Sequence, residues 1–451
     1  MKYILSVFVF SYFVSATAQH LPVFKINRLG NPAIEGYYFL AANDNILILD
    51  KDANVVYYNS LRDQALFFTL EKEGKMLFDT PKYSCLLDSN FHVADVFACQ
   101  NNIRNDKHDA LILPDNHLLL LGGEDISIDK LNYPGWSKKG SKDTAVLNAA
   151  VIQELDAKHN LVFEWHAKDH FSISDADSFL LNNDAIQEWT HSNALELDAD
   201  GNILLSSRNL NEITKINRKD GSIMWRFGGK KNEFKFVNCS LPFYGQHNIR
   251  RLSNGHFTLY DNGQNVITHG ARALEFELDE KNKIATLVWS YTYDNNMSSV
   301  GRGNVQRLAK GNTLVNFGVR SGGDVCFVIV NPAGKKLFKV SCSVPNVYKV
   351  MQYSTLPFKL HRSVVNCFDS AGVKYLDAGP EHDSYYWNTG ETSRIIAVKD
   401  SGTYVVYTPY GEGGYLSSEP VKIGDVLKPC NSNSNRNKKS FQSKTKNKDE
   451  K

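Results

Sequence analysis

Methionine and cysteine are scarce in this chain of 451 residues, with five and seven copies, and no C-x-x-C pair occurs. Without such a pair the sequence gives no support to a zinc-ribbon or dithiol redox site. No segment reaches 18 consecutive apolar residues, the length that a membrane-spanning helix needs. These absences argue against cysteine-based metal sites and helical membrane proteins.

A strong charge of one sign is also lacking, since the formal net charge is only +2. Residues 431–451 hold seven basic and two acidic side chains, whereas residues 19–430 hold 43 basic and 47 acidic ones. The slight positive charge therefore comes from the C-terminal tail. A nucleic-acid-binding surface is not indicated, and small molecules are the expected partners.

Aromatic residues and glycine are plentiful, with 25 Phe, 21 Tyr and 30 Gly, and 42% of the residues are hydrophobic. This composition supports a sizeable core and favours a β-rich protein.

The N-terminus resembles a secretory signal peptide. Lys2 is followed by an apolar run from Ile4 to Val14 and by Ser15-Ala16-Thr17-Ala18, which predicts cleavage after Ala18. A membrane anchor is the alternative, but the run is short for one. We expect an exported protein, either periplasmic or secreted to the cell surface, with residues 1–18 removed.

Export permits disulfides, and spacing alone suggests three pairs. Cys85 and Cys99 flank one hairpin-like segment, Cys326 and Cys342 flank another, and Cys367 and Cys430 bracket the last folded segment.

Internal repeats predict the fold. An apolar stretch, a polar turn and a second apolar stretch recur at 46–58, 85–97, 151–165, 213–225, 273–289 and 327–340. A second strand–turn–strand pattern precedes four of these copies, at 108–121, 191–207, 247–260 and 304–317. Two hairpins per repeat make one four-stranded blade. The sequence therefore predicts an all-β, six-bladed β-propeller over residues 19–355, with a β-sandwich or solenoid as the alternative. The inserts 122–146 and 166–188 are expected to be loops.

The repeat pattern changes near residue 355. Residues 356–428 resemble an Ig/PKD-like β-sandwich, and Asp400-x-Gly402-x-Tyr404 resembles its tyrosine corner. Residues 429–451 are rich in Asn, Ser and Lys and are predicted to be a disordered basic tail.

Three histidines begin the second pattern in successive repeats: His108, His191 and His247. In a propeller these positions lie at one mouth of the central channel, so the three imidazoles are expected to converge. They could bind a metal, as in His₃ zinc sites, or transfer a group, with one His as nucleophile. Arg208, in SSRN, disfavours a nearby divalent cation and favours an anionic substrate. A purely structural role is the remaining alternative.

Three linked motifs resemble the bacterial aryl-sulfate sulfotransferases of the arylsulfotransferase family. They are WTHSNALELDADGNILLSSRN (189–209), ITKINRKDGSIMWRFGG (213–229) and YGQHNIRRLSNGHFTLYDNG (244–263). The resemblance runs from about residue 36 to 345. It implies a six-bladed propeller that moves a sulfuryl group from a phenolic sulfate ester to another phenol. It also implies no metal, no cofactor and no 3′-phosphoadenosine 5′-phosphosulfate.

The resemblance also implies residue roles. His247 of the GQHN motif would be the nucleophile that becomes a sulfohistidine in a ping-pong reaction. His191 and Asn193 would contact the sulfuryl group or the phenolic oxygen, Arg208 would hold sulfate oxygens, and His108 would complete the anion site. The N-terminal β-sandwich that aids dimerisation in some relatives has no counterpart here, so the oligomeric state stays open.

Two other functions compete with sulfotransfer. One is a non-catalytic propeller that acts as an exported adhesin or ligand-binding module. The other is a sulfate-ester hydrolase that uses the same pocket and transfers to water.

Overall fold

The computed structural model describes residues 21–29, 34–61, 63–129, 144–177, 186–263, 270–293, 299–320, 325–344 and 346–424. The predicted signal peptide and the predicted basic tail lie outside these residues. The described chain is almost entirely β-structure, with short 3₁₀ turns at Lys72–Gly74, Ala167–Asp169, Ile173–Asp175, Arg208–Leu210 and Ala309–Gly311. No helix in the described ranges is long and apolar enough to cross a membrane.

The chain divides into two compact units, one of residues 1–360 and 410–416 and the other of residues 361–409 and 417–451. Within the described part of the first unit, six antiparallel sheets each contain four strands in series. The first three are β29-β2-β3-β4 (Val347–Tyr353, Tyr37–Ala42, Asn45–Leu49, Val55–Ser60), β5-β6-β7-β8 (Phe68–Leu70, Met76–Asp79, Ser84–Leu87, Val93–Phe97) and β9-β10-β11-β12 (Arg104–Ile112, Leu118–Asp129, Thr144–Leu155, Leu161–His166). The next three are β14-β15-β16-β17 (Ser192–Leu197, Ile203–Ser207, Glu212–Ile216, Ile223–Gly228), β19-β20-β21-β22 (His247–Arg251, Phe257–Asp261, Arg272–Asp279, Ile284–Thr292) and β24-β25-β27-β28 (Asn304–Arg307, Thr313–Asn316, Val325–Val330, Lys336–Cys342).

Extra strands extend several outer edges. They are β1 (Phe24–Arg28) on β28, β13 (Ile186–Glu188) on β11, β18 (Lys235–Val237) on β22, and β36 (Gly414–Ser417) on β4. A two-stranded ribbon pairs β23 (Ser299–Gly301) with β26 (Val319–Arg320).

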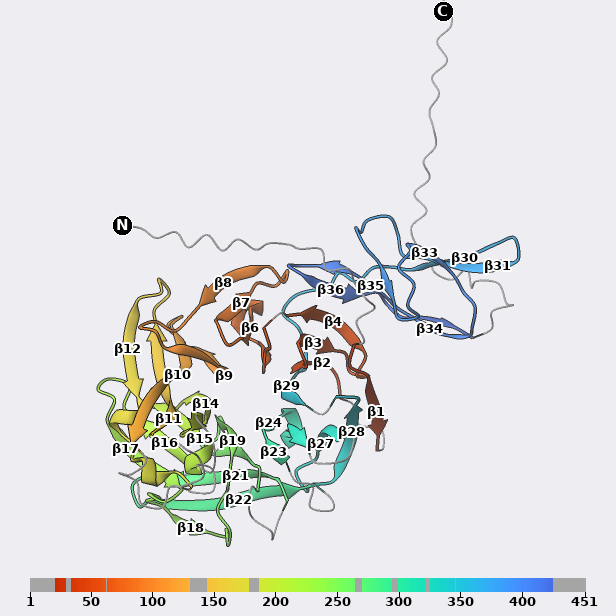
Figure 1. Cartoon of the computed structure of the whole chain (residues 1–451). Helices are drawn as coiled ribbons and strands as arrows, with labels where there is room; N and C mark the ends of the chain where they lie inside the picture. Colours follow the sequence, from red (N-terminus) through yellow and green to blue (C-terminus); the bar gives the residue numbers. More distant parts are fainter. Residues whose placement is uncertain are drawn as a thin grey trace, which may run out of the picture. The chain divides into compact units, whose positions relative to one another are not determined.

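The six sheets follow one another in a closed series that can be traced in Figure 1. Contacts join β2 to β5, β6 to β9, β9 to β14, β14 to β19 and β20 to β24. The series closes because β29 contacts β24 and β25 and pairs with β2 in register Tyr37↔Tyr353. The innermost strands themselves are in contact at five of the six junctions, and at the junction of the second and third sheets it is β6 that contacts β9.

The apolar cores lie between successive sheets. Trp165 and Trp189 are buried between the third and fourth sheets, together with residues of β10, β11 and β15. Phe227 lies between the fourth and fifth, where its ring centroid is 5.1 Å from that of Phe243 and 5.3 Å from that of Phe276. Burying each such ring stabilises the fold by about 1.5–3 kcal/mol, so the stacked faces rather than the sheet edges hold the series together.

Two expectations from the sequence are corrected. The segment 122–146 is not simply a loop, because β10 and β11 continue as a long hairpin to Asp129 and from Thr144. Cys85 and Cys99 are free thiols, so the suggested pair does not form, and the Cys342 thiol donates to Val344 O at 3.0 Å instead of bonding to Cys326. The two cysteine pairs were suggested because spacing along the chain was taken as proximity in space. Cys367 is disulfide-bonded, and its suggested partner Cys430 lies outside the described residues.

The second unit contains short strands: β30-β31-β33 (Asn366–Ser370, Val373–Asp377, Ile395–Ala397), β34-β37 (Gly402–Tyr404, Val421–Ile423) and β32-β35 (Tyr386–Trp387, Val406–Tyr410). Its core includes Trp387, Leu376 and Val406. The Tyr404 hydroxyl donates to Asp400 O at 2.8 Å, which closes the local corner suggested by the sequence.

Candidate active site

Three histidines meet where inner strands of the third, fourth and fifth sheets begin or bulge. The ring centroids of His108 and His191 lie 5.2 Å apart, and those of His191 and His247 lie 6.2 Å apart. Register shifts fall beside all three, and His191 has a positive φ of 43°. Such bulges turn a side chain away from the regular pleat. The structure thus brings together the three imidazoles that the sequence predicted to converge.

His247 is 1% exposed, and both of its ring nitrogens have partners. Nδ1 lies 2.7 Å from Asn262 Oδ1 and 3.0 Å from Gly245 O, two acceptors that require a proton on Nδ1. Nε2 accepts from the backbone N–H of Arg302 at 3.0 Å. These bonds fix the neutral tautomer with its lone pair on Nε2.

Burial lowers the pKa of His247 well below its usual range, and the charges of Arg208, His191 and His108 lower it further. A neutral imidazole is the form that can act as a nucleophile. The environment therefore keeps His247 in its reactive protonation state at neutral pH.

Carboxylates orient the other two rings. His108 Nδ1 lies 2.5 Å from Asp106 Oδ1, and His191 Nδ1 is paired with Glu188. The hydrogen bond from His191, followed by its charge, lowers the pKa of Glu188 to about 2. The Nε2 atoms of both rings have no hydrogen-bond partner among the described residues, and both histidines line one small cavity with these carboxylates. Each ring is held by a carboxylate on one side and offers Nε2 on the other.

Arg208 is 8% exposed, at the start of the 3₁₀ turn after β15. Its Nη1 donates to Asn209 Oδ1 at 2.8 Å and its Nη2 donates to Val300 O at 3.2 Å. Its positive charge contributes to the lowered pKa of His247. A buried cation beside a neutral nucleophile suits an anionic substrate.

Asn193 is fully buried in β14, and its amide donates to Gln246 O at 2.8 Å. Its Oδ1 has no hydrogen-bond partner among the described residues. The side chain therefore holds the backbone immediately before His247.

Asn193 is one of several inner-strand side chains that bond to the next inner strand. Asp109 accepts from Leu195 N at 3.0 Å, Asn248 accepts from Val305 N at 3.3 Å, and Asn304 donates to Val350 O at 2.8 Å. These bonds join the third sheet to the fourth, the fifth to the sixth, and the sixth to the first.

Asp109 ties the innermost strands together most extensively. Besides Leu195 it accepts from Arg250 Nη2 at 2.9 Å and from the Lys349 ammonium. Burial alone would raise the pKa of Asp109, but the two cations outweigh it and the pKa is lowered. One carboxylate thus links β9, β14, β19 and β29.

Sequence reasoning missed the partners that orient the histidines. Asp106 and Glu188 lie two and three residues before their histidines, a spacing that could have suggested them. Asn262 and Arg302 are 15 and 55 residues from His247, and no local pattern connects them to it.

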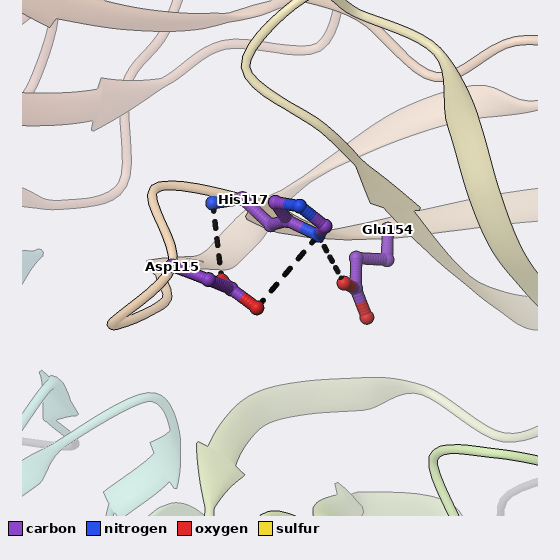
Figure 2. A group of neighbouring side chains, drawn as sticks. All are labelled: Asp115, His117 and Glu154. Atoms are coloured by element: carbon purple, nitrogen blue, oxygen red, sulfur yellow. Dashed lines mark hydrogen bonds and ion pairs between the residues drawn. The ribbon is translucent and has the colours of Figure 1, made fainter.

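A second acidic group lies outside this cluster. Asp115, His117 and Glu154 offer ligand atoms within 4.8 Å of one another, as Figure 2 shows. Arg218 already supplies a cation there, since it donates to Glu154 Oε2 at 2.7 Å and to Asp115 Oδ2 at 3.1 Å. The group is best described as an ion-pair network that joins the third sheet to the β16–β17 turn.

Comparison with known proteins decides the family. The arylsulfotransferase (ASST) family matches residues 25–325, which is well over half of the chain. The chain belongs to the arylsulfotransferase family.

No curated protein matches the chain. Among solved structures, it is similar to a protein of unknown function from Bacteroides caccae, with 14% identity, a TM-score of 0.44, and coverage of 69% of this chain and 98% of that one. It is also similar to virginiamycin B lyase from Staphylococcus aureus, with 9% identity, a TM-score of 0.37, and coverage of 79% and 96%.

Proposed function

We propose that this arylsulfotransferase-family protein is an aryl-sulfate sulfotransferase in which His247 carries the sulfuryl group between two phenols. The observation that supports this most is the state of His247: buried, neutral, fixed in the Nδ1–H tautomer, and beside the Arg208 cation. Family membership supports the same reaction type.

In the first half-reaction, His247 Nε2 attacks sulfur, an N–S bond forms, and the S–O bond to the aryl group breaks. The released phenolate has an ordinary pKa near 10 and leaves more readily when it takes a proton from a general acid. One of His108 and His191, protonated on Nε2 as well as on Nδ1, would donate this proton and become neutral, while its carboxylate holds the ring in place. Arg208 balances the charge on the sulfuryl oxygens. Asn193 Oδ1, which has no hydrogen-bond partner among the described residues, would accept from the hydroxyl of a phenol.

In the second half-reaction, the oxygen of an acceptor phenol attacks sulfur and the N–S bond breaks. The phenolic proton passes to the same histidine that protonated the leaving group. The enzyme returns to its starting state, so the kinetics are ping-pong and no cofactor is consumed.

The decisive experiment is an assay of 4-nitrophenyl sulfate with and without added phenol. A transferase releases 4-nitrophenol faster when phenol is present and produces phenyl sulfate. If 4-nitrophenol is released at the same rate with and without phenol, and free sulfate is the other product, the protein is a hydrolase. If no 4-nitrophenol is released, the result supports a non-catalytic adhesin or ligand-binding module. His247→Leu should abolish both release and covalent labelling of the protein by the sulfuryl group.

The proposal needs no metal, in contrast to the His₃-zinc alternative. Activity should survive extended EDTA treatment. Loss of activity that zinc alone restores would favour the metal site instead.

The finer architecture is also proposed. The six sheets act as the blades of a β-propeller in residues 19–355, and residues 356–428 form an Ig/PKD-like module that spaces or attaches it. The closed series of sheets supports the first assignment, and the Tyr404 corner supports the second. Export is proposed from the leader, and a mature N-terminus at Gln19, found by mass spectrometry, would support it.

A further inference from the structure

A second cavity, lined by Tyr348 and Arg302 among others, shares no lining residue with the cavity of His108 and His191. Arg302 donates its backbone N–H to His247, while its side chain lines a cavity together with Tyr348, Asn346 and Gln64. The Tyr348 ring centroid is 6.3 Å from that of His247. Two residues that line the cavity, Arg302 and Tyr348, therefore lie next to His247, whereas none of the three histidines lines it.

Two polar groups of this pocket, the Tyr348 hydroxyl and the Arg302 guanidinium, lack side-chain partners among the described residues. Tyr348 is 1% exposed, and its buried hydroxyl has no hydrogen-bond partner among the described residues. No hydrogen bond or ion pair joins the Arg302 guanidinium to another described side chain. An unpaired buried hydroxyl destabilises the folded protein, and a partly buried guanidinium without an anion carries a smaller penalty of the same kind. A ligand that satisfies both groups would remove these costs.

Positive charge predominates around the pocket. The Lys107 ammonium donates to Gln64 Oε1 at 2.7 Å, a neutral acceptor on the pocket wall. Burial lowers the pKa of Lys107, and the positive charge of Arg302 lowers it further against the smaller effects of Asp106 and Asp44. Asp106, the nearest of these carboxylates to the site, already pairs with His108. The pocket is thus lined by Arg302 and Tyr348, the Lys107 ammonium is bonded to its Gln64 wall, and none of its described lining residues is acidic.

The cavity is small. Its volume of about 20 Å³ exceeds what one water molecule needs but cannot hold an aromatic ring. Gln64 is exposed, so the cavity has a solvent-facing side. A compact anionic head attached to a larger substrate fits this space.

We propose that Arg302, Lys107 and Tyr348 form a subsite for a carboxylate borne by the phenolic substrate. The inference rests on the proposed sulfotransferase function. The phenolic oxygen reacts at His247, while the carboxylate of the same molecule accepts hydrogen bonds from the guanidinium fork and the Tyr348 hydroxyl. The enzyme then selects phenolic acids over neutral phenols.

The test compares two acceptors, 4-hydroxyphenylacetate and 4-hydroxyphenylacetamide, with 4-nitrophenyl sulfate as donor. The methylene group separates the substituent from the ring, so the two phenols differ little in reactivity. A charge-assisted pair of hydrogen bonds should give the carboxylate about a ten- to hundredfold higher kcat/KM. In Arg302→Gln this ratio should fall to about one, whatever the absolute rate, because Gln keeps the backbone N–H and loses the charge.

Three further variants sharpen the result. Tyr348→Phe removes a hydroxyl that has no partner in the described part of the chain, so the protein should stay folded while the ratio falls severalfold. Lys107→Gln should also lower the ratio, and Lys281→Gln, a change of an exposed surface cation, should leave it unchanged. Equal use of the two acceptors by the wild type, or an unchanged ratio in Arg302→Gln, would overturn the subsite.

Binding without turnover separates this proposal from the proposed function. Titration calorimetry of the resting protein should detect 4-hydroxyphenylacetate but not its amide, and Arg302→Gln should weaken that binding at least tenfold. If no phenol is sulfated yet this binding difference appears, the transferase function fails and the carboxylate subsite stands. If phenols are sulfated without any binding difference, the subsite fails and the function stands.

Discussion

The backbone N–H of Arg302 donates to Nε2 of His247 across 3.0 Å, so the lone pair of the proposed nucleophile is occupied in the resting protein. Attack on sulfur must break this hydrogen bond. A neutral amide is a weak competitor, and the same bond prevents a ring flip that would exchange Nδ1 and Nε2. The contact holds the imidazole ready while the substrate is absent.

We expect Arg208→Lys to lower kcat for 4-nitrophenyl sulfate about 10²–10³-fold. Lysine keeps the charge but loses the planar fork that can hold two sulfuryl oxygens. The loss of bonds to Asn209 and Val300 should cost about 1–3 kcal/mol of unfolding free energy, which leaves the protein folded. Steady-state kinetics and urea denaturation check both effects. Arg394→Lys, in the second unit, is the matched control, and near-normal turnover in Arg208→Lys would show that charge alone suffices.

Asn262 is expected to be a positioning residue. Its Oδ1 accepts from His247, and its Nδ2 donates to Arg302 O at 2.9 Å and to Ser299 Oγ at 3.0 Å, so its orientation is fixed. Asn262→Asp places a negative charge against the imidazole and should raise the pKa of His247. The acid limb of the rate profile should then move to higher pH, in addition to a rate loss of about tenfold or more. Asn254→Asp in an exposed turn is the control, and a rate loss without the pH shift would indicate a structural role only.

The pH dependence of the first half-reaction follows from the lowered pKa of His247. The reactive form is neutral, so it persists as the pH falls below 6.5 and is lost only at the depressed pKa. Single-turnover release of 4-nitrophenol, measured without acceptor, should therefore not fall between pH 7.5 and about pH 6. An acid limb centred on the ordinary histidine pKa would contradict the burial argument.

The free energy of unfolding should also depend on the protonation of His247. Below pH 6.5 the unfolded chain binds a proton at this histidine that the folded protein excludes, so the free energy of unfolding falls as the pH falls towards the folded pKa. In His247→Leu this part of the pH dependence should disappear from urea unfolding curves recorded between pH 5 and 8. An unchanged slope in the variant would assign the effect to other groups.

Asp109→Asn is expected to destabilise the first unit by about 3–5 kcal/mol, because it leaves the buried Lys349 without its counterion and leaves Arg250 with only Glu196 at 3.7 Å. Adding Lys349→Met should recover part of the loss. Urea denaturation measures both, and Asp383→Asn, an exposed position, serves as the control. Wild-type stability in Asp109→Asn would mean that the cations find other partners.

The sequence allowed the histidine cluster to be predicted because His108, His191 and His247 share one phase of a repeat. Each repeat folds locally as hairpins, so residues at the same position of successive repeats come to lie at the same position of successive sheets. The supporting residues could not be predicted this way. Asn262 and Arg302 reach His247 from a different strand end and from the next repeat, and only the packing of whole sheets brings them there.

The pairing of the first sheet also escaped prediction. Its innermost strand, β29, comes from the far end of the repeats, where the sequence pattern appeared to change. No local periodicity assigns it to Tyr37–Ala42, because that pairing is required only by closure of the series. The suggested pairs Cys85–Cys99 and Cys326–Cys342 failed for a related reason, since flanking a hairpin does not bring two Sγ atoms together.

Closure by β29 sets the order in which the protein can mature. During synthesis β2 emerges early and keeps an unpaired edge until Val347–Tyr353 is available. Contacts between such distant segments form slowly, and open edges invite pairing with other chains. Tyr348 and Lys349 arrive on this last strand, and with them the wall of the proposed carboxylate pocket and the second cation on Asp109. A chain still being made therefore lacks the complete candidate site, and a chain that ended before Val347 would leave the series of sheets open.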